Sequence, residues 1–259
     1  MDIHKLTISE VKDLLQNTHI VSEDLLNALR RDNRKGIQVL LKKYYREQEI
    51  LRRKNDNAKK LLQYEKRIWS QGYINIGGVD EAGRGPLAGP VVSACVILPK
   101  NLIIVEIDDS KKLSAAKREE LYNRIFNNAY AIGIGIVENK RIDEINIYNA
   151  TKEAMIQAVL ASKQQPDFLL LDAMNLKELP IPQLSVIKGD SKSQSVAAAS
   201  IIAKVTRDRI MEDFAKLYPQ YGFEKHKGYG TKEHVEAIRK YGTTPIHRLS
   251  FLDKILPTM

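Results

Sequence analysis

Residues 73–86 read YINIGGVDEAGRGP, and this stretch decides the fold of the chain. An apolar run leads to two adjacent acids, Asp80 and Glu81, and then to a turn with the sequence Gly83-Arg84-Gly85. Carboxylate oxygens bind divalent cations, whereas backbone N–H groups beside a guanidinium group bind phosphate. The stretch therefore predicts a strand over 73–79 that ends at a site for a metal and a phosphate. An ordinary turn with solvated charges is the alternative, because glycine and proline mark turns in any protein.

Beyond residue 73 the chain carries short apolar runs first and then alternates them with helical patterns. We expect helices at 114–127, 143–163 and 191–218, the last opened by a capping box from Ser191 to Gln194. We expect strands at 73–79, 91–98, 130–137, 168–171 and 184–187. Strands in succession followed by alternating strands and helices indicate an α/β domain on a mixed sheet.

The first 72 residues have a different pattern and predict a small helical extension before a domain at 73–259. Thr7 or Ser9 can cap a first helix and Ser22 a second, and one long amphipathic helix is expected from about 34 to 65. Residues 30–67 contain 14 Lys and Arg and 5 Asp and Glu, so this segment alone has a net charge of +9, equal to that of the whole chain. A basic segment beside a nearly neutral body suggests a polyanionic partner, although a solvated helical face has the same composition.

The composition limits the class of protein. A chain of 259 residues with 43% hydrophobic and 28% charged residues has enough apolar side chains for a core. Cys95 is the single cysteine, so an intrachain disulfide and a zinc site with several cysteines are excluded. With neither a membrane-spanning run nor a secretory pattern, the sequence predicts a cytoplasmic protein that does not bind membranes.

Acids follow three of the expected strands. Asp80 and Glu81 follow the first, Asp172 follows 168–171, and Asp190 follows 184–187 at the start of the last helix. Ligands of open α/β sheets gather at the carboxyl ends of strands, so these acids are expected to converge. Oxygen-only ligands favour Mg²⁺ or Mn²⁺, and two such ions about 4 Å apart promote in-line displacement at a phosphodiester. Taken singly, Asp190 is also a possible helix cap and Asp172 a possible turn residue.

Two further segments suit nucleic acid. Ser110, Lys111 and Lys112 place a hydroxyl and two ammonium groups in one loop, which suits phosphate, although a polar turn has the same composition. Residues 221–231 interleave aromatic and basic residues, and Tyr229 stands between two glycines. An aromatic ring held clear of the backbone can meet the face of a sugar or a base.

Five blocks of this sequence, in order, resemble bacterial ribonuclease HII, the type 2 ribonuclease H. The blocks are residues 80–91, 109–113, 171–172, 188–190 with 197–205, and 226–231, and the resemblance extends from 73 to about 252. It implies the ribonuclease H-like fold, a five-stranded mixed sheet flanked by helices. It also implies cleavage of the RNA strand of RNA–DNA hybrids, and of duplex DNA on the 5′ side of a single embedded ribonucleotide, leaving 5′-phosphate and 3′-hydroxyl ends.

The resemblance implies roles for particular residues. Asp80, Glu81, Asp172 and Asp190 would be catalytic and would hold two Mg²⁺ or Mn²⁺ ions. The turn of Gly83, Arg84 and Gly85 would contact the ribose 2′-hydroxyl and a phosphate, with Ser110, Lys111 and Lys112 as further substrate contacts. Tyr229 would pack on the deoxyribose that follows the ribonucleotide. The protein is expected to act as a monomer on nucleic acid, with the basic extension adding phosphate contacts.

Two rival functions remain at this stage. A type 3 ribonuclease H has the same general chemistry, but it usually begins with a β domain and places Glu at the fourth acidic position. A nucleic-acid-binding module without catalytic activity is the rival from another class, with the acids holding only a structural ion.

Overall fold

The computed structural model describes residues 6–17 and 21–253. The chain divides into two compact units, Met1–Asn57 and Ala58–Met259. Our sequence-based boundary after residue 72 stays a prediction. Within the described residues, no helix is long and apolar enough to cross a bilayer.

The first unit contains α1 (Ile8–Asn17), α2 (Glu23–Arg30) and most of α3 (Lys35–Lys60). Thr7 rather than Ser9 caps α1: its hydroxyl accepts from the Glu10 N–H at 3.3 Å, and the Glu10 carboxylate accepts from the Thr7 N–H at 2.7 Å. Ser22 caps α2 as expected. The apolar faces of the three helices meet in a small core, including Val11, Leu29 and Ile37.

The long helix expected from 34 to 65 is two helices, because α3 ends at Lys60 and α4 spans Gln63–Trp69. The break has a clear cause. The carbonyl of Leu61 accepts a hydrogen bond from the N–H of Gln194 at 2.9 Å, so it is directed to another segment at the point where a continuous helix would use it. α4 then packs through Ile68 in the second unit, against side chains of the sheet such as Leu170.

The second unit is built on five strands in the order β3-β2-β1-β4-β5. The strands are β1 (Ile76–Ala82), β2 (Val91–Ile97), β3 (Ala131–Val137), β4 (Phe168–Asp172) and β5 (Gln183–Val186). β1, β2 and β3 form antiparallel pairs, whereas β4 lies parallel to β1 and to β5. The five-stranded mixed sheet predicted from the sequence is therefore confirmed.

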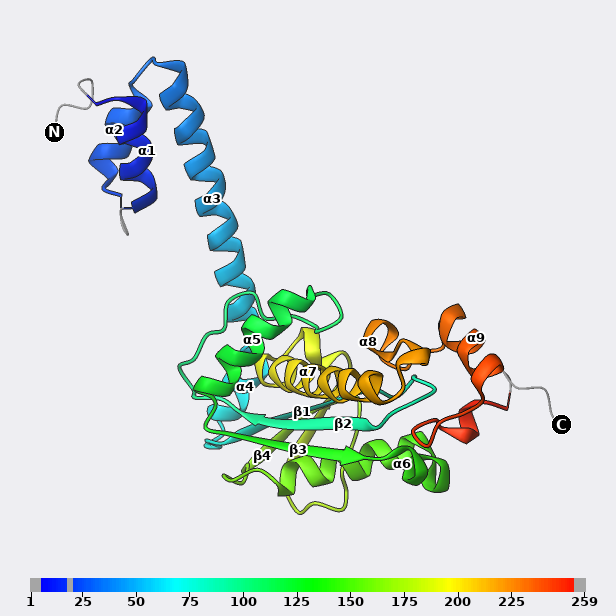
Figure 1. Ribbon diagram of the computed structural model, residues 1–259. Coiled ribbons are helices and arrows are strands. Elements are labelled where there is room, and N and C mark those ends of the chain that lie inside the picture. The colour runs from blue at the N-terminus through cyan, green and yellow to red at the C-terminus, as the bar shows by residue number, and fades with distance from the viewer. Residues whose placement is uncertain (1–5, 18–20, 254–259) are drawn as a thin grey trace. The chain divides into compact units, whose positions relative to one another are not determined.

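Helices cover both faces of this sheet (Figure 1). α5 (Ala115–Asn128) and α7 (Gln194–Leu217) pack on one face, and α6 (Asn139–Leu160) packs on the other. Two shorter helices, α8 (Phe223–His226) and α9 (Lys232–Tyr241), follow α7 and were not among the expected elements. Together with a single-turn 3₁₀ segment before α8 (Pro219–Tyr221) and another after α9 (Leu249–Phe251), they form a further apolar cluster around Phe223.

Two boundaries differ from the sequence-based expectation in ways that matter for the site. β1 starts and ends three residues later than predicted, because its pairing with β2 continues to Glu81–Ser93 and Ala82–Val92. The two acids are therefore part of the strand and do not follow it. α7 starts at Gln194 with Ser193 as its cap, so Asp190 and Ser191 belong to a separate 3₁₀ turn, η2 (Gly189–Ser191).

A glycine in β1 determines how closely α7 approaches the sheet. A Cβ atom on Gly78 would lie 2.1 Å from the carbonyl carbon of Ser195, well inside van der Waals contact. Only glycine permits this distance, so the start of α7 lies directly against β1. η2 precedes α7 and is brought to the same strand.

Candidate active site

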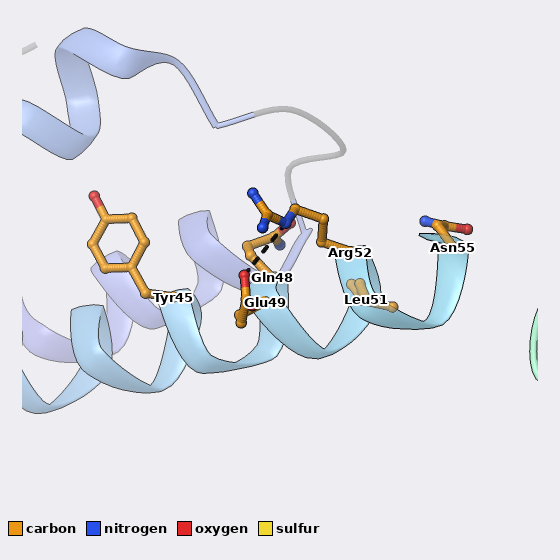
Figure 2. A pocket seen from close by; sticks show the side chains of 6 residues that line it. All are labelled: Tyr45, Gln48, Glu49, Leu51, Arg52 and Asn55. Carbon is orange, nitrogen blue, oxygen red and sulfur yellow. Dashed lines mark ion pairs between the residues drawn. The ribbon is translucent and has the colours of Figure 1, made fainter. Parts of the chain in front are cut away.

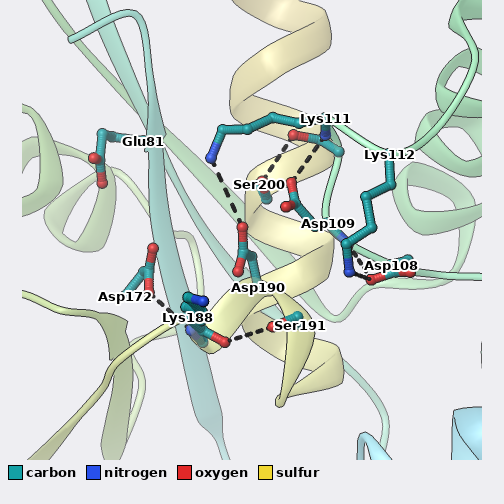
Figure 3. Close-up of polar contacts among 12 residues, drawn as sticks. Glu81, Asp108, Asp109, Lys111, Lys112, Asp172, Lys188, Asp190, Ser191 and Ser200 are labelled. Atoms are coloured by element: carbon teal, nitrogen blue, oxygen red, sulfur yellow. Dashed lines mark hydrogen bonds and ion pairs between the residues drawn. The ribbon is translucent and has the colours of Figure 1, made fainter.

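Three distant segments bring four carboxylates to one edge of the sheet, called here the acid edge: Asp80, Glu81, Asp172 and Asp190. The parallel register pairs Val79 with Leu171, so Asp80 and Asp172 are the next residues of neighbouring strands. The N–H of Gly189 donates to Asp172 Oδ1 at 2.8 Å, which ties η2 to the end of β4. The ends of β1 and β4 and the turn η2 are therefore neighbours, and Figure 3 shows Glu81, Asp172 and Asp190 on these segments.

The acid edge is electrostatically unfavourable for the protein alone. Burial raises the pKa of Asp80 well above its usual range, and the charges of Glu81 and Asp172 raise it further. Burial also raises the pKa of Glu81, although Arg84 opposes the shift. The pKa of Asp190 is raised by burial and by the charges of Asp109 and Asp172. Neighbouring carboxylates repel one another when ionised, and a bound positive charge would relieve that repulsion.

Two of the acids are turned towards cationic partners of their own. Glu81 Oε1 lies 3.4 Å from Arg84 Nη1, and Asp190 Oδ2 lies 3.9 Å from Lys111 Nζ. Accordingly, within 6–17 and 21–253 no three His, Cys, Asp or Glu side chains are already gathered around one point as a metal site.

The donor chemistry of the acid edge nevertheless fits a divalent cation. All four side chains offer oxygen, the ligand that Mg²⁺ and Mn²⁺ prefer. Glu81 Oε2 is buried and has no hydrogen-bond partner among the described residues. A buried carboxylate oxygen without a donor is costly, and a cation supplies what is missing.

The turn after β1 is held from behind by two buried arginines that sequence analysis missed. Arg248 donates to the carbonyls of Gly83 at 2.6 Å and Arg84 at 3.0 Å. Gly83 has φ +98°, and a Cβ atom there would lie 2.1 Å from Arg207 Nε, so the turn requires glycine for two reasons. No local sequence pattern marks either arginine, because all their acceptors are backbone carbonyls of other segments.

Together the two guanidinium groups bind six carbonyls. Arg207 donates to Pro90, Lys227 and Ala88, and Arg248 donates to Gly89, Arg84 and Gly83. Burial lowers the pKa of Arg207 to about 10 and that of Arg248 to about 9. Both remain cations at neutral pH, so positive charge lies directly behind the turn.

Tyr229 lies beside this turn, as the sequence-based site requires. The N–H of Leu87 donates to the carbonyl of Gly228 at 2.8 Å, which joins residues 83–90 and 226–231, called here the paired loops. A Cβ atom on Gly85 would lie 3.7 Å from Tyr229 Cε1. Tyr229 is 45% exposed, so part of the residue is open to a ligand, while the Arg207 guanidinium lies 6.0 Å from the ring centroid.

The loop at 110–112 contributes one of its three expected residues to the acid edge. Lys111 reaches Asp190, whereas Lys112 turns to Asp108 at 2.9 Å (Figure 3). Ser110 is 3% exposed, and its hydroxyl shares a hydrogen bond with Ser200 of α7 at 3.0 Å. Ser110 therefore anchors the loop on α7, and its hydroxyl does not face outward.

A hollow of about 570 Å³ lies elsewhere, along α3 of the first unit (Figure 2). Its lining includes Tyr45, Leu51 and Glu49, and Glu49 is paired with Arg52 at 3.5 Å and with Arg53 at 2.8 Å. It contains none of the predicted site residues, so the acid edge is the better candidate for chemistry.

Comparison with known proteins gives a consistent result. The family model described as Ribonuclease HII matches residues 77–254, and that described as Ribonuclease HII N-terminal domain matches 7–69. A ribonuclease HII of Lactobacillus delbrueckii subsp. bulgaricus is 54% identical over 95% of both chains, and one of Bacillus cereus is 51% identical over 96% of both. The crystal structure of ribonuclease H2 from Pyrococcus horikoshii OT3 matches with a TM-score of 0.61 at 28% identity, covering 70% of this chain and 97% of that one.

Proposed function

The chain belongs to the ribonuclease HII family, whose members are endoribonucleases acting on RNA–DNA hybrids, and we propose that it also cuts duplex DNA at single embedded ribonucleotides. The cut is placed on the 5′ side of the ribonucleotide and leaves 5′-phosphate and 3′-hydroxyl ends. The observation that supports the proposal most is the position of Tyr229 beside Gly85, because Gly85 follows strand β1, which carries Asp80 and Glu81 near its end.

We assign catalysis to Asp80, Glu81, Asp172 and Asp190, which would hold two Mg²⁺ or Mn²⁺ ions. When bound, such ions supply activation of the attacking water and stabilisation of the departing 3′-oxygen. The raised pKa values of Asp80, Glu81 and Asp190 support the assignment, because a bound cation reverses the repulsion that causes part of each shift. The share of the protein is to hold the carboxylates at one sheet edge and to neutralise phosphate charge with Lys111 and Arg84.

We assign recognition of the ribonucleotide to the paired loops. The 2′-hydroxyl is the chemical difference that separates RNA from DNA at one nucleotide. A turn made of Gly83, Arg84 and Gly85 lets the backbone approach that group without side-chain bulk, and Arg248 and Arg207 hold the turn rigid. Tyr229 presents its exposed face to the next sugar, where ribose would clash and deoxyribose would fit.

One assay tests this specificity. Three duplexes of the same sequence are compared in Mg²⁺ and in Mn²⁺: all DNA, DNA with one ribonucleotide, and a uniform RNA–DNA hybrid. We expect cleavage of the second at the 5′ side of the ribonucleotide, with a phosphate on the 5′ end of the product, and no cleavage of the first. Cleavage of the hybrid alone would leave the endoribonuclease activity intact and refute the junction specificity.

For the extension at 1–72 we propose added contacts to phosphate. α3 carries exposed cations, including Lys43, Arg52 and Arg53. Replacing these three by Gln in the full chain removes three positive charges without removing the helix. The slope of log K against log salt for hybrid binding is expected to fall by up to about 0.9 for each phosphate that the variant no longer neutralises. An unchanged slope would contradict a role of α3 in binding.

A further inference from the structure

Three histidines gather beneath the loop that carries Tyr229, and nothing said so far gives them a role. His226 ends α8, His234 lies in α9, and His247 precedes the buried Arg248. The rings of His226 and His234 stack with centroids 4.5 Å apart, and His234 Nε2 lies 3.1 Å from His247 Nε2. His234 and His247 are fully buried.

The hydrogen-bond partners determine where each ring carries its proton. His234 Nδ1 lies 2.9 Å from the carbonyl of Tyr229, which can only accept, so this nitrogen donates. The N–H of Thr244, which can only donate, lies 2.8 Å from His247 Nδ1, so that nitrogen accepts. His247 must then carry its proton on Nε2 and donate it to Nε2 of His234.

The third ring is determined in the same way. His226 Nε2 lies 2.8 Å from the carbonyl of Tyr221 and therefore donates. His226 Nδ1 accepts from the N–H of Gly228 at 3.2 Å. The set is self-consistent only if each ring is neutral, because a second proton on any of them would face a donor.

The surroundings keep the buried pair neutral. Burial lowers the pKa of His234 to about 4 and that of His247 to about 4. The ring of Phe223 packs edge-on against His234, and the ring of Tyr221 lies 5.3 Å from that of His247. At neutral pH both rings therefore act as fixed hydrogen-bond groups with one proton each.

These bonds fall on the backbone on either side of the Tyr229 side chain, at the peptide groups Lys227–Gly228 and Tyr229–Gly230. His226 binds the N–H of Gly228 before the tyrosine, and His234 binds the carbonyl of Tyr229 after it. Gly228 has φ +85°, and a Cβ there would lie 2.6 Å from the carbonyl of Ala88, so the backbone is also fixed against the facing loop. The backbone that carries the tyrosine side chain is thereby held on both sides by histidine hydrogen bonds.

We propose that His234 is a positioning residue: oriented by a hydrogen bond from neutral His247, and stacked on His226 which binds Gly228, it fixes the backbone at Tyr229 and so sets the discrimination of the enzyme for an RNA–DNA junction. This inference rests on the role proposed above for Tyr229.

The tautomers can be measured independently of activity. Long-range ¹H–¹⁵N spectra of the full-length protein at pH 7, assigned with single histidine replacements, report which ring nitrogen carries the proton. We expect His234 protonated on Nδ1, and His226 and His247 protonated on Nε2. The opposite tautomer at His234, or a doubly protonated ring at His234 or His247, would overturn the proposal.

Two replacements of His234 then separate positioning from packing. Asn places an amide N–H where Nδ1 stood and can still donate to Tyr229, whereas Gln mimics Nε2 and cannot. The readout is kcat/KM for a duplex with one ribonucleotide divided by kcat/KM for a uniform hybrid. We expect His234→Gln to lower this ratio about fivefold, as for one lost hydrogen bond, and His234→Asn to restore most of it. Equal ratios for the two variants, whether lowered or not, would overturn the proposal.

A double-mutant cycle shows whether the effect passes through Tyr229. We expect Tyr229→Ala to lower the ratio about tenfold or more, and His234→Gln to add nothing in that background. Additive losses would overturn the proposal. If Tyr229→Ala leaves the ratio unchanged, the proposed role of Tyr229 is refuted and the positioning role falls with it, while the ¹⁵N data still report on the three histidines. Leu121→Ala shortens a buried side chain of α5 in the core on the sheet, away from the histidines. It controls for loss of stability, because it should destabilise the protein and leave the ratio unchanged.

Discussion

The acid edge and the paired loops form the two halves of the proposed site, and they are held in place by opposite means. The acid edge brings together groups of like charge, including Asp80 and Asp172, on neighbouring strands. The paired loops place buried donors against carbonyl acceptors, with Arg207 and Arg248 alone supplying six hydrogen bonds. One half therefore lacks a charge that a ligand must bring, and the other is complete without a ligand.

This difference separates two kinds of preorganisation. Carboxylates that repel one another reduce the stability of the fold unless an opposite charge binds between them. Buried donors with satisfied acceptors increase rigidity, since removing one leaves polar groups unpaired in the interior. Mutations in the two halves should consequently move stability and activity in different combinations.

The largest effect is expected for Asp80→Asn. Removing one carboxylate of the acid edge is expected to lower kcat by about 10³-fold or more, since it removes one of the proposed metal ligands. The fold should become more stable by about 1 kcal/mol at neutral pH in the absence of divalent ions, because repulsion from Glu81 and Asp172 is relieved. Urea unfolding with EDTA, together with single-turnover cleavage, measures both quantities.

The pH dependence gives the same test a sign. Because the pKa of Asp80 is raised in the folded state, its contribution to stability is full below the unfolded value of about 3.9 and is lost as pH rises through the higher folded value. The unmutated protein without metal should lose stability upward from about pH 4, and Asp80→Asn should flatten that loss. A variant less stable than the parent at pH 7 would contradict the view of the acid edge as strained.

The two halves also differed in how far the sequence predicted them. Asp80, Asp172 and Asp190 each follow an apolar run, so the rule that ligands gather at the carboxyl ends of strands was enough to bring them together. The sequence placed the acids after the strand, however, because it gave no information on how far β1 pairs with β2. Their catalytic assignment stays a prediction that the variants above are designed to test.

The support for the paired loops was not predictable in this way. Arg207 lies in the middle of α7 and Arg248 near the end of the described chain, and both donate to carbonyls more than a hundred residues away or in another loop. Every residue has a backbone carbonyl, so the sequence does not show which carbonyls accept hydrogen bonds, and no pattern connects these arginines with Gly83. Ser110 shows the same limit, since a serine in a polar loop gave no indication that its partner is Ser200.

A smaller effect, of the opposite character, is expected for Arg248→Met. It leaves the carbonyls of Gly83, Arg84 and Gly89 without their donor and should lower stability by about 2–4 kcal/mol. Activity should fall about tenfold, because the turn loosens while the acids remain. Arg248→Lys keeps the positive charge but has fewer hydrogen-bond donors, so its stability and activity should lie between those of the parent and of Arg248→Met. Unfolding curves and cleavage rates of both variants test this; a Met variant as stable as the parent would show that the bonds do not rigidify the turn.

The smallest effect is expected at the boundary between the halves, where Lys111 and Lys112 allow a matched comparison. Desolvation near the protein surface opposes protonation of the exposed Lys111, but Asp109, Asp190, Asp80 and Asp172 together outweigh it and raise the pKa of this ammonium group, which lies 3.9 Å from Asp190. Lys112 is bonded to Asp108 and directed away from the acid edge.

Replacing Lys111 or Lys112 by Met removes one positive charge from the same loop, so long-range attraction of nucleic acid changes equally in the two variants. We expect kcat/KM to fall about fivefold for Lys111→Met, a loss of the size expected for one charged contact near a reacting phosphate. For Lys112→Met we expect a loss of less than about twofold. Equal losses would mean that the loop acts only through its net charge, and the distinction between a cation placed at the acid edge and one placed beside it would have no functional consequence.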